Sequence, residues 1–240
     1  MLYKTLLGYK TMNIKTHWFN IFDNKNDEKC NVINAFCELA YTYTSNERKF
    51  HNLKYLEYSF NVLNNLIAEN KPNLSESIIL DLHTSLFFSN ISLDSDKSNC
   101  ITEALTNLIN MGITRWDCFS NVKNLIATLN SNMIDETIDF SALAQSIISD
   151  TDLAWFSTGR QEYIQNCRNL FEESGFNSIG EYALIRTQWL MSMLNRKKVY
   201  LNNSAYLNEN VARSNMEWEL NSWTKLAVKE LVGEIVPVRI

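Results

Sequence analysis

Glycine and proline are scarce in this chain, which has six glycines and two prolines among its 240 residues. Both residues interrupt regular structure, so their scarcity favours long helices joined by short loops. Apolar residues recur at intervals of three and four, as in Val32, Phe36 and Leu39, which is the helical period. An alternating strand pattern occurs only in residues 234–240, where a proline allows at most an edge strand. The expected fold is all-α, a single compact domain of many helices.

The sequence also lacks the features that define several common protein classes. No apolar run approaches the ~18 residues of a membrane-spanning helix, and residues 1–11 lack the apolar core of a signal peptide. A glycine-rich phosphate loop and a G-x-S-x-G segment are both missing, which excludes P-loop and nucleophile-elbow sites. The net charge is −5, and no basic run is longer than residues 196–198. We therefore expect neither nucleic acid nor a membrane as a partner.

Paired cysteines are missing as well. The count of five is odd and no C-x-x-C pair occurs, so a zinc site or disulfide framework is not indicated. A reduced, cytoplasmic chain with buried thiols is the economical interpretation. The seven-residue spacing of Cys30 and Cys37 is expected to place both on the core face of a helix. The cysteines are Cys30, Cys37, Cys100, Cys118 and Cys167.

The apolar periods divide the chain into a series of expected helices. Residues 12–232 are expected to form one helical domain, with an N-terminal extension at 1–11 and a tail at 233–240. Loops are expected where polar residues gather between the helices. Among the helices, 181–200 is predicted as one long helix and 209–231 as the last. The other expected helices include the apolar sets of residues 32–40, 53–66, 79–86, 101–109, 122–129, 140–148 and 163–171.

Histidine is the scarcest of the residues that carry chemistry, with three in the chain. His51 lies in the segment ERKFHNL, residues 47–53, directly before a helical apolar pattern. A histidine that opens a helix can ligate a metal, or it can donate its ring N–H to a backbone carbonyl; on its own the second interpretation is favoured. His17 has no assignable role. His83 lies too far along its helix to replace a ligand at residue 90.

Several motifs in a consistent order resemble a family of predicted metal-dependent HD-superfamily phosphohydrolases. The resemblance extends over about three quarters of the chain, from Tyr43 to Leu220. It begins with Tyr43 and the RKFHNL segment and includes DTDLA at residues 150–154. Further matches are Tyr163, Arg168, Phe171, Arg186, Leu190, Leu194, Arg196, Tyr200, and the ENVARSN segment of residues 209–215. The resemblance implies an all-α HD-like fold and hydrolysis of a phosphate ester.

Most positions at which the family has metal ligands carry other residue types in this chain. The positions of its histidines read His51, Tyr55, Ser89 and Ser131, and the HD aspartate reads Asn90. Hydroxyl and amide groups are weak ligands for a catalytic divalent ion, which requires imidazoles and carboxylates with open positions for water. What remains of the implied site is His51 with Asp150 or Asp152.

These departures lead to the hypothesis of a catalytically inactive HD-like protein, a pseudoenzyme without a cofactor. It would bind a phosphorylated ligand, such as a nucleotide or signalling nucleotide, or a protein partner, without turnover. Two alternatives stay open. One is a residual phosphohydrolase with a metal on His51 and Asp152, helped by Asp81, Asp94 or Asp96; the other is a purely structural interaction protein. The expected ligand-binding residues are Arg48, His51, Tyr55, Ser89, Asn90, Ser131, Asp150 and Asp152.

The arginines and tryptophans allow two interpretations each. Arginine binds phosphate in a bidentate manner, and Arg48 is the arginine most open to that role. For Arg196 and Arg213, ion pairs with glutamates such as Glu209 are favoured. The tryptophans could stack on a nucleobase, but core packing is favoured because each lies in an apolar helical pattern. They are Trp155, Trp189, Trp218 and Trp223.

Overall fold

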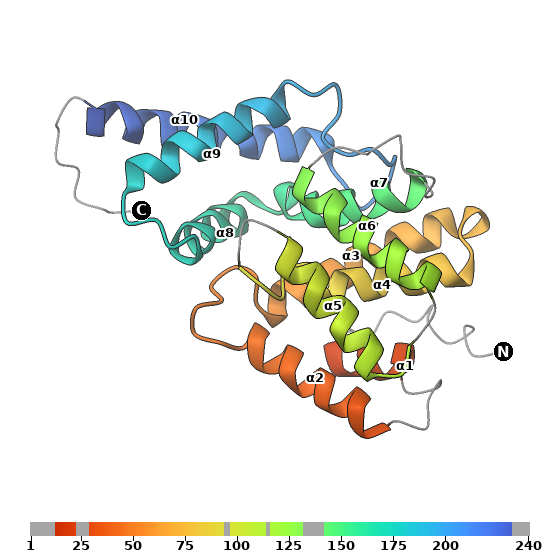
Figure 1. Ribbon diagram of the computed structural model, residues 1–240. Coiled ribbons are helices and arrows are strands. Elements are labelled where there is room, and N and C mark those ends of the chain that lie inside the picture. The colour runs from red at the N-terminus through yellow and green to blue at the C-terminus, as the bar shows by residue number, and fades with distance from the viewer. Residues whose placement is uncertain (1–12, 23–28, 94–96, 114–115, 132–141, 232–240) are drawn as a thin grey trace. The chain divides into compact units, whose positions relative to one another are not determined.

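The protein is all-helical over the residues that the computed structural model describes, which are 13–22, 29–93, 97–113, 116–131 and 142–231. In this part of the chain ten α-helices and two 3-10 helices follow one another, and no strand occurs (Figure 1). The all-α prediction is confirmed. The chain forms two compact units, Met1–Ser45 with His51–Ile148, and Asn46–Phe50 with Ser149–Ile240.

The first unit is built around α4, which lies against α3, α5 and α6. Most of α4 is buried, including Asp81, Thr84 and Ser85, so it has no continuous polar face. The helices are α1 (Ile14–Phe22), α2 (Lys29–Tyr43), α3 (Leu53–Asn70), η2 (Lys71–Asn73), α4 (Glu76–Phe88), α5 (Ser98–Asn110), α6 (Trp116–Ser131) and the first part of α7 (Ala142–Leu153).

Aromatic side chains form the centre of the first unit. Trp18 of α1 is fully buried; its ring lies 4.9 Å from Phe87 and 5.9 Å from Phe36, measured between centroids. Its indole N–H donates to the carbonyl of Val32 at 3.1 Å. An indole N–H that is buried requires such a partner, so this bond fixes α1 on α2. The sequence did not predict α1, whose nine residues contain one of the largest core side chains.

His17 is buried in this core, and His83 is half-buried beside it. The ring of Phe60 stacks on His17 at 5.0 Å and on His83 at 5.9 Å. His83 Nε2 also lies 2.9 Å from Asn64 Oδ1. Burial lowers the pKa of His17, and burial together with His17 lowers the pKa of His83 to about 3. Both rings are therefore neutral aromatic groups of the core near neutral pH.

The second unit contains the end of α7, η3 (Ala154–Ser157), α8 (Arg160–Glu173), α9 (Ile179–Leu194) and α10 (Glu209–Leu231). The last two helices pack along one another, as Figure 1 shows with α9 in cyan and α10 in blue. Gly175 has a φ of 69°, a left-handed conformation that glycine adopts without a steric penalty, and it directly follows the last turn of α8. Trp155, Phe156 and Tyr163 pack against one another, and the ring of Phe156 also stacks on Trp189 of α9.

Most helix predictions are confirmed, and the last helix has the predicted bounds of 209–231. The prediction of one helix over 181–200 is wrong, because α9 ends at Leu194. Apolar periodicity continues past this residue, but the backbone groups of residues 194–202 bond to side chains of other segments. These bonds replace the helical ones. The tail, the extension 1–11 and residues 132–141 lie outside the described part.

The cysteine and tryptophan predictions were right in part. Cys100, Cys118 and Cys167 are buried, but Cys30 and Cys37 are exposed, so their shared face of α2 is not a core face. Trp155 and Trp223 are buried as expected, whereas Trp218 is 37% exposed and lies under Arg160, whose Cζ is 5.5 Å from the ring centroid. None of the described helices combines the length and apolar character that a membrane span requires.

Candidate functional site

The positions that resemble the HD pair, Ser89 and Asn90, follow directly on α4 and are buried. A lysine ammonium lies against both. Lys97 Nζ donates to the carbonyl of Ser89 and to Asn90 Oδ1, each at 2.8 Å. The Asn90 amide also donates to Ser89 Oγ at 3.3 Å. A positive charge is therefore held at the end of α4, where it interacts favourably with the helix dipole.

His51 and Tyr55 lie at the start of α3, in the same unit. Asn52 caps this helix, since its side chain accepts from the backbone N–H groups of Lys54 and Tyr55 at 3.0 and 3.2 Å. The ring of His51 meets Tyr55 edge-on, with 5.0 Å between the centroids. The local prediction of a helix opening after His51 is confirmed.

The remaining predicted residues are distributed differently. Arg48, Asp150 and Asp152 belong to the second unit; the first two are buried and Asp152 is half-buried. Ser131 ends α6, but its side chain lies outside the described part of the structure. The eight residues predicted to bind a ligand thus do not all belong to one unit.

The residues at the resembling positions do not fit a divalent metal. Asn90 offers a neutral amide oxygen, and that oxygen already accepts from the Lys97 ammonium. A second cation next to the ammonium would be repelled at this distance. Among the residues that the structure describes, no three His, Cys, Asp or Glu side chains are grouped as metal ligands. The further candidate Asp81 accepts from the Asn121 amide at 2.7 Å, and Asp94 and Asp96 lie outside the described residues.

Asp150 instead anchors the segment that follows α9. Its Oδ1 accepts from the backbone N–H of Leu201 at 2.8 Å, and its Oδ2 accepts from the backbone N–H and side-chain amide of Asn202 at 2.7 and 2.9 Å. Burial raises the pKa of Asp150 to about 6 in spite of these bonds, and the charge of Glu209 adds to the effect. Tyr200 strengthens the anchor, since its hydroxyl donates to the carbonyl of Leu153 at 3.2 Å.

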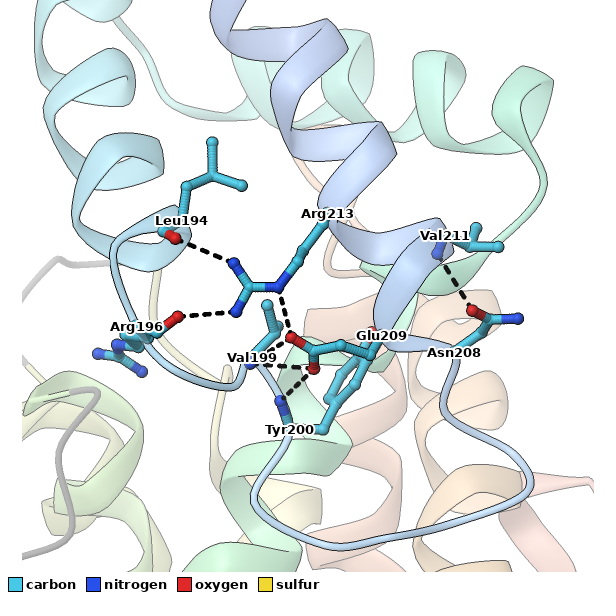
Figure 2. A network of polar contacts seen from close by, with 8 residues as sticks. All are labelled: Leu194, Arg196, Val199, Tyr200, Asn208, Glu209, Val211 and Arg213. Carbon is cyan, nitrogen blue, oxygen red and sulfur yellow. Dashed lines mark hydrogen bonds and ion pairs between the residues drawn. The ribbon is translucent and has the colours of Figure 1, made fainter.

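Glu209, the first residue of α10, binds the same segment at residues 199 and 200, directly before the two residues that Asp150 binds. Its carboxylate accepts from the backbone N–H of Val199 at 3.0 Å and of Tyr200 at 3.2 Å. It also accepts from Arg213 Nε at 2.7 Å, one turn further along the helix (Figure 2). The prediction that Arg213 pairs with a glutamate is confirmed, although the pair lies within one helix.

Arg213 also ends α9. Its two terminal nitrogens donate to the carbonyls of Leu194 at 2.9 Å and Arg196 at 2.7 Å (Figure 2). Helix ends leave carbonyl groups without helical partners, and a planar guanidinium can satisfy two of them together with a carboxylate. The motif residues Asp150, Glu209 and Arg213 therefore share one structural task, which is to fix residues 194–202.

A second network lies in the core of this unit around Glu219. Its carboxylate accepts from Arg186 Nε at 2.7 Å, from the Trp223 indole at 3.0 Å and from the Tyr163 hydroxyl. Burial alone would raise the pKa of Glu219, but Arg186 and the hydrogen bonds outweigh burial and hold the pKa below its ordinary value. The Arg186 guanidinium also lies over the Trp189 ring, 4.6 Å from the centroid. This is a satisfied buried ion pair.

Sequence reasoning missed Lys97, Glu219 and Lys198. Lys97 carries no sequence signal of this role, because metal-ligand patterns consist of imidazoles, thiolates and carboxylates and do not include an ammonium. Glu219 lies near the end of the resemblance among unmatched residues. Lys198 belongs to the longest basic run, residues 196–198, but such a run does not indicate where its charges lie in the fold.

Comparison of the chain with protein-family models, with curated proteins and with solved structures finds no match. The function is therefore argued from the residues of this chain, and no family is assigned.

Proposed function

We propose that this protein is a non-catalytic member of the HD phosphohydrolase type, which binds a phosphorylated small molecule without hydrolysing it. The observation that carries the proposal is the Lys97 ammonium, 2.8 Å from both the Ser89 carbonyl and Asn90 Oδ1. By the resemblance, these two residues stand at the namesake His-Asp positions. The ammonium supplies positive charge where the family would hold its metal.

An ammonium cannot replace the chemistry of a divalent ion. It carries one charge, it has no open coordination position, and it does not lower the pKa of a bound water as a catalytic metal does. Serine at position 89 offers no imidazole. Positive charge at this position binds the Ser89 carbonyl and the Asn90 amide oxygen, but it does not activate water.

The environment of Asp150 supports the same proposal. Both of its oxygens accept hydrogen bonds from residues 201 and 202. A carboxylate that holds a loop in this way has less capacity to ligate a metal. Asp152 is half-buried and is left as the acidic residue of the DTDLA motif that is accessible to solvent.

Binding and turnover can be separated in one experiment on the full chain. Nucleotides, cyclic nucleotides and signalling dinucleotides are screened by thermal shift, and each compound that raises the melting temperature is then incubated with and without Mn²⁺ and analysed by chromatography. A ligand that binds the native state must raise the melting temperature. We expect stabilisation without breakdown. Metal-dependent breakdown that His51→Ala abolishes would instead establish a residual hydrolase.

The role of Lys97 can be tested by rebuilding the metal site. In the double variant Ser89→His/Asn90→Asp, the new carboxylate would pair with the Lys97 ammonium. We therefore expect tight Mn²⁺ binding by calorimetry only when Lys97→Ala is added to the double variant. Lys71→Ala, a substitution at an exposed lysine of the same unit, is the control and should leave the double variant unchanged. Equal Mn²⁺ affinity with and without Lys97 would contradict its role as the built-in cation.

A further inference from the structure

The second unit contains a pocket of about 420 Å³ that none of the predicted ligand-binding residues lines. It is formed by the segment between α9 and α10 together with the first residue of α10. Its volume is in the range of small-molecule sites. The lining combines apolar surface from Leu207 with the polar side chains of Lys198, Asn203 and Ser204.

Three hydrogen-bond donors of this lining come from seven consecutive residues. Lys198 Nζ donates to Asn203 Oδ1 at 3.2 Å. Because the amide oxygen faces the lysine, the NH₂ group on the other branch of Asn203 is available as a donor. Ser204 Oγ accepts from the backbone N–H of Tyr206 at 3.1 Å, so its own proton can also be donated. The pocket thus presents an ammonium, an amide and a hydroxyl.

The two carboxylates near the pocket accept hydrogen bonds from the protein itself, and one of them also has a cationic partner. Glu209 is part of the lining, but its carboxylate pairs with Arg213 and accepts from Val199 and Tyr200. The carboxylate of Asp150 accepts from Leu201 and from Asn202, which also lines the pocket. The backbone N–H groups of residues 199–202 are used by these two carboxylates, so a ligand would be recognised by side chains.

The segment is held in place before any ligand arrives. Besides the two carboxylates, Arg213 fixes the carbonyls of Leu194 and Arg196, and the Tyr200 hydroxyl bonds to Leu153. Ordering a flexible loop upon binding lowers affinity, and a segment that is already fixed avoids much of this cost. Lys198 and Asn203 are exposed enough to reach an incoming ligand.

We infer that this pocket binds the phosphate group of a small phosphate monoester, with Lys198 as the main charged contact. Lysine binds phosphate as a point charge, and the Asn203 amide and Ser204 hydroxyl provide donors for the remaining oxygens. The apolar surface of Leu207 then contacts the organic part of the ester. The inference rests on the proposed binding of a phosphorylated small molecule, and it assigns this binding to the pocket of the second unit, whereas Lys97 belongs to the first.

The test compares two neighbouring lysines in the full chain. Binding of AMP, of inorganic phosphate and of adenosine as the phosphate-free compound is measured by calorimetry for the wild type, Lys198→Ala and Lys197→Ala. Lys197 is an exposed residue outside the pocket lining, so its substitution removes the same charge without removing the contact. We expect Lys198→Ala to weaken AMP and phosphate binding about ten- to a hundred-fold, the range of a charge-assisted hydrogen bond. Lys197→Ala should weaken it by less than about threefold, the effect of a screened surface charge.

Each other outcome has a defined meaning. Equal losses in both lysine variants would overturn the inference in favour of a general electrostatic effect. Binding of AMP that Lys198→Ala leaves unchanged would overturn the site but not the proposed function. Binding of adenosine as tight as that of AMP would overturn the phosphate assignment. If the wild type binds neither phosphate compound, nor any phosphorylated compound of the thermal screen, both proposals fail.

Discussion

Two pairs of titratable groups, one from each unit, show opposite protonation states. In the first unit His17 and His83, which both stack on Phe60, are neutral because burial lowers the pKa of each. The second unit buries ionised groups and pairs them, as in Arg186 with Glu219. Desolvation disfavours charge in both units, so the presence of a partner of opposite charge determines whether a group is ionised. Asp150 is intermediate, because it has hydrogen-bond donors without a cation, and its pKa rises to about 6.

The largest effect is expected from breaking the buried ion pair. Arg186→Met leaves the Glu219 carboxylate buried without its cation, which should lower the free energy of unfolding by about 3–5 kcal/mol in urea denaturation. Arg160→Met is the control, since that guanidinium lies at the surface over Trp218. A loss below about 1 kcal/mol in Arg186→Met would contradict the description of Glu219 as a charged group.

Acid should destabilise the first unit through His83. The unfolded chain binds a proton at the ordinary pKa of 6.5, whereas folded His83 stays neutral down to about 3. Stability is therefore lost as the pH falls through this window, by about 3 kcal/mol between pH 7 and pH 4. His83→Gln removes the titration and keeps a group that can bond to Asn64. We expect its stability to fall less than that of the wild type over this range, and parallel curves would refute the assignment.

Asp150 should give a smaller effect of the opposite sign. Its pKa in the folded protein is about 6, above the ordinary 3.8, so ionisation favours the unfolded chain and stability falls as the pH rises from about 4 to about 6. Asp150→Asn removes this titration but turns an amide N–H toward backbone donors. Relative to the wild type, the free energy of unfolding of the variant should rise by about 2 kcal/mol between pH 4 and pH 7. A constant difference at all pH values would mean that Asp150 has the same pKa in the folded and the unfolded chain.

The helices could be predicted from sequence because the signal is local. Spacing of apolar residues and the lack of glycine and proline sufficed for α2 to α6 and for α10. The end of α9 could not be predicted, because Arg213 and Glu209 reach it from a later segment of the chain. The same limitation applies to α1, whose Trp18 is stabilised by contacts with α2 and α4 that leave no mark in its own nine residues.

The candidate site was harder to predict than the fold. The sequence predicted Asp150 as a ligand-binding residue and Arg213 as the partner of a glutamate such as Glu209, but it did not connect Asp150 with the other two, which share its contacts with residues 194–202. Their task could not be inferred, because a carboxylate that binds a metal and one that binds two backbone amides look alike in a sequence. The contacts of Lys97 with Ser89 and Asn90 could not be predicted either, because nothing in the sequence distinguishes this lysine from an exposed one.

The four amides of residues 199–202 have a consequence for the dynamics of the second unit. Each donates to a carboxylate that belongs to a helix, Asp150 in α7 or Glu209 in α10. Backbone amides in connecting segments ordinarily exchange with solvent deuterons quickly, because local opening exposes them at little cost. Here opening requires release from both carboxylates. The backbone amides of residues 199–202 should therefore exchange about as slowly as those of the helices that hold them, and more slowly than the amides of the neighbouring segments.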